Sequence, residues 1–260
     1  MFFRKKRDAI SKLAIILIVT AVVVVVVGAV LAVTLLGFWQ PFGQIVGSEN
    51  LVVEEKDFSD FTIVEVGSGF EVEITQSSSY SINITADDNV LDYIEVSKSG
   101  NTLTIRLKWG YSYQSVTLRA EVTIPELYEL QFSGGTHGTV EGFISSHEFV
   151  LGLSGGSHLS GNFTTSGDAQ FLLSGGSHLT GLDGTANDLN ISASGGSGLV
   201  LSDFPVHDAT INLSGGSSAT INLDGRLDAD LSGGSSLGYI GNPTMGDIDT
   251  SGSSTIEKTG

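Results

Sequence analysis

The chain has 260 residues, no cysteine and a formal net charge of −17 at pH 7. Without cysteine it has no disulfide framework, so packing and hydrogen bonds must stabilise its folded part. From residue 41 onward, 28 acidic and 7 basic residues give a net charge of −21, which would repel a phosphate backbone and excludes nucleic acid as a partner.

A basic tail and an uncharged stretch open the chain. Residues 1–12 hold five Lys or Arg residues against one acid, and residues 13–38 carry no charge. About 20 helical residues cross the hydrocarbon core of a bilayer, whereas a cleaved signal peptide has an apolar segment of about 7 to 15 residues. We therefore expect an uncleaved signal-anchor helix at 13–38. Because basic residues stay on the cytoplasmic side, the tail is expected in the cytoplasm. The remainder, after a linker at 39–50, is expected outside the cell membrane.

The region 51–125 has the pattern of β-strands that are longer and less regular than those that follow. Apolar and polar residues alternate at 61–66, 70–75, 80–85, 102–108 and 116–124, with turn signals at 67–69, 87–89 and 99–101. Because an uncovered edge of a β-ladder invites aggregation, we expect this region to begin the following repeat structure and to cover its N-terminal end.

Three aromatic residues lie near the end of this region. Trp109, Tyr111 and Tyr113 alternate with small residues, so an extended segment would place them on one face. Flat aromatic rings beside polar edges suit the binding of sugar rings. The same rings could instead pack over the first repeat, and the residues alone leave both interpretations open.

Residues 126–260 consist of a repeat of about 20 residues. The motif Ser-Gly-Gly recurs with spacings of 18 to 21 residues, followed by a degenerate Ser-Gly-Ser copy. These motifs begin at Ser133, Ser154, Ser174, Ser194, Ser214, Ser232 and Ser251. The residues one and three positions before each serine are apolar almost throughout, and the residue between them is mostly polar. This period of two is typical of a strand with one buried face.

A repeat of this length is too short to bury a core alone, so successive copies are expected to stack about 4.8 Å apart, with like residues over like. The glycine pair can turn each corner because glycine adopts positive φ without steric cost. The hydroxyl residue after each pair can form a ladder beside the corner. The sequence therefore predicts an all-β protein, a parallel β-helix or solenoid of about seven coils.

Several segments resemble a known family. They are the opening Phe58-Ser-Asp-Phe-Thr-Ile-Val-Glu-Val, the turn Gly100-Asn-Thr-Leu-Thr-Ile, the junction Ile124-Pro-Glu-Leu-Tyr-Glu-Leu-Gln-Phe-Ser-Gly and the Ser-Gly repeats. Together they resemble the "putative auto-transporter adhesin, head GIN domain" family, also classed as a domain of unknown function, over most of the region outside the membrane. The resemblance implies an exported β-helical domain and carries over no catalytic residue.

Three histidines recur at one position of the repeat. His137, His158 and His178 each stand four residues after the serine of their motif, so stacking would bring their imidazoles to about 5 Å from one another. Imidazoles at that spacing could hold a metal ion. No acid shares this position, which favours an exposed polar ladder instead.

Four aspartates form a second cluster in the repeat. Asp228 and Asp230 stand four and two residues before one motif serine, and Asp247 and Asp249 hold the same positions before the next. Stacking places these four carboxylates on the outward face of neighbouring coils. We expect no cofactor, and calcium is the one ion that this cluster could hold, because oxygen clusters of this kind suit it. The alternative is an acidic surface that favours solubility.

The repeat argues against catalysis. A catalytic site needs convergent, unlike groups, whereas the repeat places the same residue type in successive coils. We expect a non-catalytic module for binding, adhesion or envelope structure, with an envelope glycan or a surface protein as its partner. The alternative is a β-helical polysaccharide lyase or hydrolase. Such an enzyme needs acids and bases on one face, and Arg226 is the only base between residues 120 and 257.

Overall fold

The computed structural model describes residues 43–260. The basic tail, the signal anchor predicted at 13–38 and the start of the linker lie outside the described residues. Within 43–260, no helix is long and apolar enough to cross a membrane, and the one helical element is a short 3-10 turn, η1 (Leu91–Tyr93). The described chain divides into two units, a small one with residues 43–45 and 109–112, and a large one with 46–108 and 113–260.

Strands form three sheets in the described chain, two of them large. The ten-stranded sheet has the order β22 (Thr244–Thr250), β20 (Arg226–Leu231), β18 (Ala209–Leu213), β16 (Leu189–Ala193), β14 (Ala169–Leu173), β12 (Phe149–Leu153), β10 (Glu129–Phe132), β3 (Ile63–Val66), β7 (Thr102–Leu107), β6 (Ile94–Ser99). The eleven-stranded sheet has the order β2 (Leu51–Glu55), β5 (Ser81–Asp87), β9 (Leu118–Ile124), β4 (Glu71–Gln76), β11 (His137–Ser145), β13 (His158–Thr165), β15 (His178–Thr185), β17 (Gly198–Val206), β19 (Ser218–Leu223), β21 (Ser236–Ile240), β23 (Thr255–Lys258). A separate pair joins β1 (Gln44–Val46) and β8 (Ser112–Gln114).

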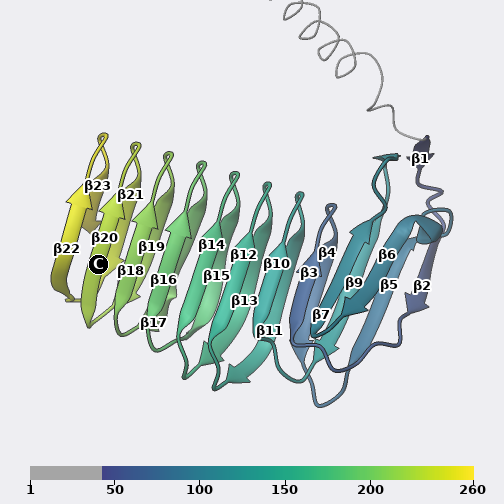
Figure 1. Ribbon diagram of the computed structural model, residues 1–260, viewed down its shortest axis with the longest axis horizontal. Helices are drawn as coiled ribbons and strands as arrows, with labels where there is room; N and C mark the ends of the chain where they lie inside the picture. Colours follow the sequence, from purple (N-terminus) through teal and green to yellow (C-terminus); the bar gives the residue numbers. More distant parts are fainter. Residues whose placement is uncertain (1–42) are drawn as a thin grey trace, which may run out of the picture. The chain divides into compact units, whose positions relative to one another are not determined.

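From β10 onward the chain alternates between the two large sheets, as Figure 1 shows. Each strand pairs in parallel with the strand two elements later, for example β12 with β14 and β13 with β15. The predicted all-β solenoid is thereby confirmed. Seven Ser-Gly corners enclose six intervals, so the structure has about six turns where the sequence predicted about seven coils.

The register places the repeat positions over one another. Leu151 pairs with Phe171, Phe171 with Ile191, and Ile191 with Ile211. All four side chains are fully buried, so the position three residues before each serine forms one continuous column of the core. Because like positions stack, one apolar residue in each coil contributes to an interior that no single coil could enclose.

The corners are built as the motif predicts. In Ser174-Gly-Gly-Ser177, both Gly175 and Gly176 have positive φ, +64° and +74°. An added Cβ on Gly175 would lie 3.1 Å from the backbone nitrogen of Gly155 in the preceding coil, so glycine also permits the close approach. The Ser177 hydroxyl is fully buried and donates to the carbonyl oxygen of Ser174 at 2.9 Å. The buried hydroxyl ladder therefore satisfies a carbonyl group within its own corner.

At the N-terminal end of the large unit, parallel stacking gives way to antiparallel pairing. β3 and β4 pair in parallel with β7 and β9, which continues the stack. β6 then pairs antiparallel with β7, β5 with β9, and β2 with β5. These added strands cover the ladder edges of β7 and β9. Of them, β2 and β6 were not among the strands predicted from the sequence.

Candidate functional site

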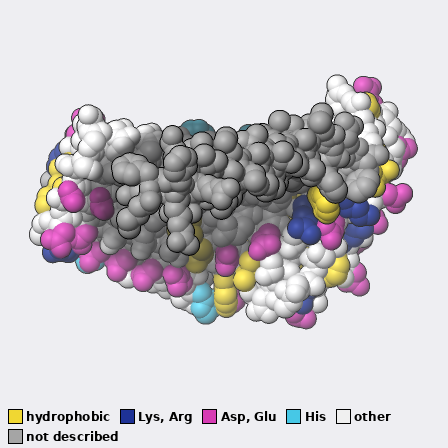
Figure 2. Space-filling model, turned by 45° about the horizontal axis from the view of Figure 1, so that its top comes forward, with side chains coloured by type: hydrophobic (Ala, Val, Ile, Leu, Met, Phe, Trp, Pro, Cys, Tyr) yellow, Lys and Arg dark blue, Asp and Glu magenta, His cyan; other side chains and the backbone are white. Residues whose placement is uncertain are grey.

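A column of acids lies at the entry to the ten-stranded sheet. We call Glu148, Asp168, Asp188 and Asp208 the acidic column. Each precedes the first residue of its strand, from β12 to β18, and these first residues pair coil to coil. Arg226 holds the same position in the next coil. In Figure 2, acidic side chains (magenta) form a row along the lower left of the drawn face, and the larger groups of basic side chains (dark blue) lie on its right.

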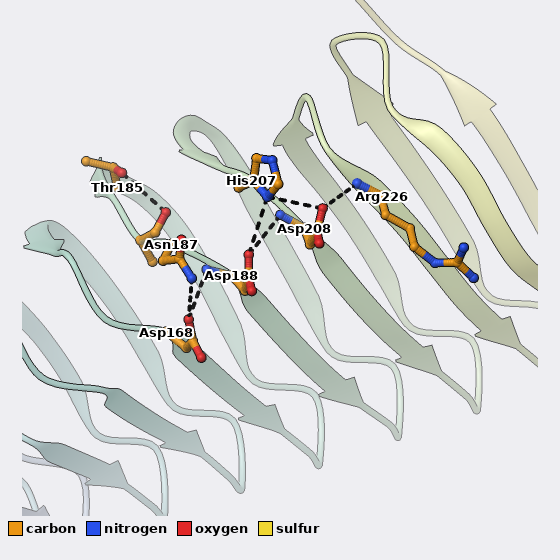
Figure 3. A network of polar contacts seen from close by, with 8 residues as sticks. Asp168, Thr185, Asn187, Asp188, His207, Asp208 and Arg226 are labelled. Atoms are coloured by element: carbon orange, nitrogen blue, oxygen red, sulfur yellow. Dashed lines mark hydrogen bonds and ion pairs between the residues drawn. The ribbon is translucent and has the colours of Figure 1, made fainter.

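Hydrogen bonds tie the acidic column together along the solenoid (Figure 3). Asp168 Oδ1 accepts from Asn187 Nδ2 at 2.9 Å and from the Asp188 amide at 3.3 Å. Asp188 Oδ1 accepts from the Asp208 amide at 3.1 Å, and Asp208 Oδ1 accepts from the Arg226 amide at 2.5 Å. Each of these carboxylates thus binds the backbone of the next coil, which explains why short acids suit the position.

One histidine lies against this column. His207 Nδ1 is 3.2 Å from Asp208 Oδ1 and 3.8 Å from Asp188 Oδ1, and the imidazole is about two-thirds exposed. In the described part of the chain, Asp188, His207 and Asp208 are the one group of three or more metal-ligating side chains whose donor atoms all lie within 4.8 Å of one another. None of these three residues was among the site residues predicted from the sequence.

The acidic column borders an open groove of about 390 Å³. Its floor carries uncharged polar side chains of the neighbouring strands, Gln170, Asn190 and Thr210. These side chains stand one coil apart at the same register position. The groove therefore presents amide and hydroxyl groups on successive paired strands, beside the carboxylates of the acidic column.

The four aspartates predicted as a calcium site lie on neighbouring strands, but among the described residues no three of them bring donor oxygens within 4.8 Å of one another. Asp228 and Asp230 lie on β20, Asp247 and Asp249 lie on the adjacent strand β22, and Asp230 pairs directly with Asp249. All four line one open depression of about 500 Å³. Calcium binding by this group stays a prediction.

Arg226 changes the electrostatics of that cluster. Its Nε and Nη2 atoms donate to Asp228 at 2.8 and 2.7 Å, and these bonds lower the pKa of the Asp228 carboxyl. Nη2 also lies 3.8 Å from Asp247 Oδ2. Arg226 thus offsets part of the negative charge of the aspartates that the sequence pattern predicted to bind calcium.

The three aromatic residues divide between the two units. Trp109 and Tyr111 belong to the small unit and Tyr113 to the large one. Trp109 is 83% exposed, while Tyr113 donates from its hydroxyl to the carbonyl oxygen of Lys108 at 2.7 Å and meets the Tyr93 ring edge-on at 6.3 Å. Sugar binding by the three rings stays a prediction.

The three histidines stack as the spacing predicted. His137 pairs with His158, and His158 with His178, with the first two rings stacked at 6.1 Å. His137 Nδ1 lies 2.8 Å from the carbonyl oxygen of Gly135, and His158 Nε2 lies 3.2 Å from Thr180 Oγ1. The imidazoles of His137 and His158 thus each contact a polar neighbour of their own, which favours the polar-ladder interpretation.

His158 makes the stability of the solenoid depend on pH. Burial, with smaller contributions from His137 and His178, lowers the pKa of His158 below the usual 6.5. In the unfolded chain His158 binds a proton near pH 6.5, whereas in the folded chain it does so only at lower pH. Its contribution to stability is therefore intact above pH 6.5 and declines as the pH falls below it.

We expect the urea midpoint of the full-length chain to fall more between about pH 7.5 and 5.5 than that of His158→Gln. An equal fall of the urea midpoint in the unchanged chain and in His158→Gln would contradict this expectation.

A positional signal for the acidic column is present in the sequence. Its members each stand six residues before the serine of their motif, a position that the apolar columns do not occupy. Aligning the repeats on their serines would have identified the column. The contact of His207 with Asp188 has no such signal, because the pattern His-acid also occurs at His147-Glu148 and does not show which imidazole lies between carboxylates of two coils.

Comparisons with known proteins agree with the fold. The profile of the family described as "Putative auto-transporter adhesin, head GIN domain" matches residues 60–243. A "putative adhesin" from Bacteroides fragilis has a TM-score of 0.76 at 19% identity, covering 83% of this chain and 100% of its own. Another from Parabacteroides merdae has a TM-score of 0.64 at 18% identity, covering 84% and 99%.

A third solved structure carries a different description. A "putative lipid binding protein" from Parabacteroides distasonis has a TM-score of 0.59 at 19% identity, covering 84% of this chain and 100% of its own. At these identities the similarity shows a shared fold and no more. None of the curated proteins compared with the chain matches it.

Proposed function

Because the chain belongs to the "Putative auto-transporter adhesin, head GIN domain" family, we propose that it is a non-catalytic adhesin-like module that binds a polysaccharide of the cell envelope. The supporting observation is the groove beside the acidic column, with polar side chains repeated one coil apart. A ligand with its own repeat can contact several equivalent groups at once, which raises its total affinity without a deep pocket.

The charge of the groove narrows the ligand class. Carboxylates of the acidic column repel polyanions, and the described residues between 120 and 257 offer one base, Arg226, which contacts Asp228. Neutral sugars have hydroxyl groups that carboxylate and amide side chains can bind by hydrogen bonds. We therefore propose a polymer of neutral sugars as the ligand, with a surface protein as the alternative.

The proposal includes attachment to the cell membrane. The uncharged run at 13–38 after a basic tail supports a single signal-anchor helix with the N-terminus in the cytoplasm. Attachment of this kind would hold the solenoid outside the membrane, next to envelope polymers. The aromatic residues Trp109, Tyr111 and Tyr113 are proposed as an additional contact for sugar rings.

Co-sedimentation with insoluble neutral envelope polysaccharide tests this function. We expect the detergent-purified full-length chain to be retained, and the triple variant Asp168→Asn, Asp188→Asn and Asp208→Asn to be retained about tenfold less. Asparagine keeps the oxygen that binds the next coil, so the variant removes charge and leaves the hydrogen bond. The matched control Asp183→Asn with Asp203→Asn alters exposed acids of the eleven-stranded sheet and should leave retention within twofold.

Further arms of the same assay separate the alternatives. Loss of retention in Trp109→Ala/Tyr111→Ala/Tyr113→Ala would support the aromatic contact, and loss on calcium removal would support the calcium prediction. Sustained release of new reducing ends would establish the lyase or hydrolase alternative. Failure of the full-length chain to be retained, or equal losses in the acidic-column and control variants, would overturn the proposed function.

A further inference from the structure

We propose that Asp188, His207 and Asp208 bind a divalent transition-metal ion of the Zn²⁺ class. The proposed site shares Asp188 and Asp208 with the groove proposed for glycan, but metal binding is measured without glycan and does not involve the aspartates on β22. It rests on the convergence of one imidazole nitrogen with two carboxylates that come from neighbouring coils (Figure 3).

The distances match the size of such an ion. Zn²⁺ bonds to nitrogen and oxygen are about 2.0–2.2 Å long, so the donor atoms of a tetrahedral site lie about 3.4 Å apart. His207 Nδ1 lies 3.2 Å from Asp208 Oδ1 and 3.8 Å from Asp188 Oδ1. Small side-chain rotations would therefore place the three donor atoms at three corners of a tetrahedron around the ion. The side chains are between 44% and 66% exposed, which leaves the fourth position open to water.

The imidazole distinguishes this group from an acidic surface. Seven residues before the seven motif serines, the repeats carry Glu126, His147, Gly167, Asn187, His207, Gly225 and Thr244. Asn187 donates its amide to Asp168, and His147 lies against Glu126 and the Tyr128 ring. His207 is thus the one member of this column, within the described chain, whose nitrogen lies between carboxylates of two coils.

Backbone hydrogen bonds hold the two carboxylates in place, while the guanidinium of Arg226 donates its hydrogen bonds to Asp228. Asp188 Oδ1 and Asp208 Oδ1 each accept one backbone N–H of the following coil. Such outer contacts orient metal ligands. The guanidinium of Arg226 extends away from His207 in Figure 3 and contacts Asp228 instead. Two carboxylates beside one imidazole leave negative charge that a divalent ion can balance.

The donor set also predicts selectivity. Calcium and magnesium prefer all-oxygen sites, whereas imidazole nitrogen favours zinc, copper and nickel. We therefore expect Zn²⁺ to bind this group and Ca²⁺ not to compete for it. The competing interpretation is an ion pair between protonated His207 and the two aspartates, which needs no metal.

Calorimetric titration of the metal-free full-length chain with Zn²⁺ tests the proposal. We expect one site per chain, unaffected by excess Ca²⁺ and weakened about tenfold or more by His207→Ala, Asp188→Asn or Asp208→Asn. The matched control His147→Ala removes the other histidine of the column and should change the affinity less than twofold, as should Asp230→Asn. Circular dichroism of each variant checks that the fold is kept. A full-length chain without a site, or a site lost equally in His147→Ala and His207→Ala, would overturn the inference.

Discussion

Replacing Phe171 with alanine is expected to lower the free energy of unfolding by about 3–5 kcal/mol, the usual cost of deleting a buried phenylalanine. Phe171 is fully buried on β14 and pairs with Leu151 on one side and Ile191 on the other. Its ring meets Phe149 edge-on at 6.4 Å and lies 5.8 Å from Phe204. The truncation would therefore leave a cavity between coils that rigid ladders on both sides prevent from closing.

The neighbouring residue supplies the control for this prediction. Leu172 lies on the same strand but points outward and is 37% exposed, so Leu172→Ala should cost less than about 1 kcal/mol. Urea denaturation of the full-length chain, followed by circular dichroism, measures both changes. Similar costs for the two variants would mean that the alternation of inward and outward residues has been misassigned.

Replacing Gly184 with alanine is the second change with a large expected effect, about 2–5 kcal/mol from backbone strain and overpacking together. Gly184 has a φ of +132° and pairs with Phe163 of the preceding coil. An added Cβ would overlap the carbonyl oxygen of Phe163, a backbone atom that cannot move without disturbing the ladder. Glycine within a strand marks such close approaches.

Gly181, in the same coil, separates strain from overlap. It has a φ of +64°, and an added Cβ would meet nothing within 4 Å. Gly181→Ala should therefore cost only the strain of the left-handed conformation, about 1–2 kcal/mol. The measurement compares urea midpoints of the two variants in the full-length chain. If Gly184→Ala proved no more destabilising than Gly181→Ala, the close approach of the coils at this position would be contradicted.

The repeat made much of the large unit predictable from residues alone. Parallel ladders place equal repeat positions over one another, so aligning seven serines was sufficient to identify the columns through Phe171 and Ser177 and the stacking of His137 on His158. The same logic brought Asp230 opposite Asp249. It would also have revealed the acidic column, had the position six residues before each serine been aligned.

Contacts that break the repeat were not predictable in this way. Arg226 occupies an acidic-column position yet directs its guanidinium to Asp228. Asp87 is almost fully buried and accepts from the amides of Glu49 and Thr117, which are far from it in sequence. Each of these contacts depends on a side-chain rotamer or a chain path that occurs only once in the molecule. A repeating pattern of residue types therefore cannot predict it.

The sequence by itself determined the class of fold, the buried and outward positions of the coils, and the tight corners, because a strand period of two in a repeat of about 20 residues can bury its apolar face only by stacking on the next copy. Only the tertiary structure decided which polar groups meet across coils. Whether His207 reaches Asp188, and whether Arg226 offsets Asp228, depends on ångström-scale offsets between neighbouring coils, which a pattern of residue types does not encode.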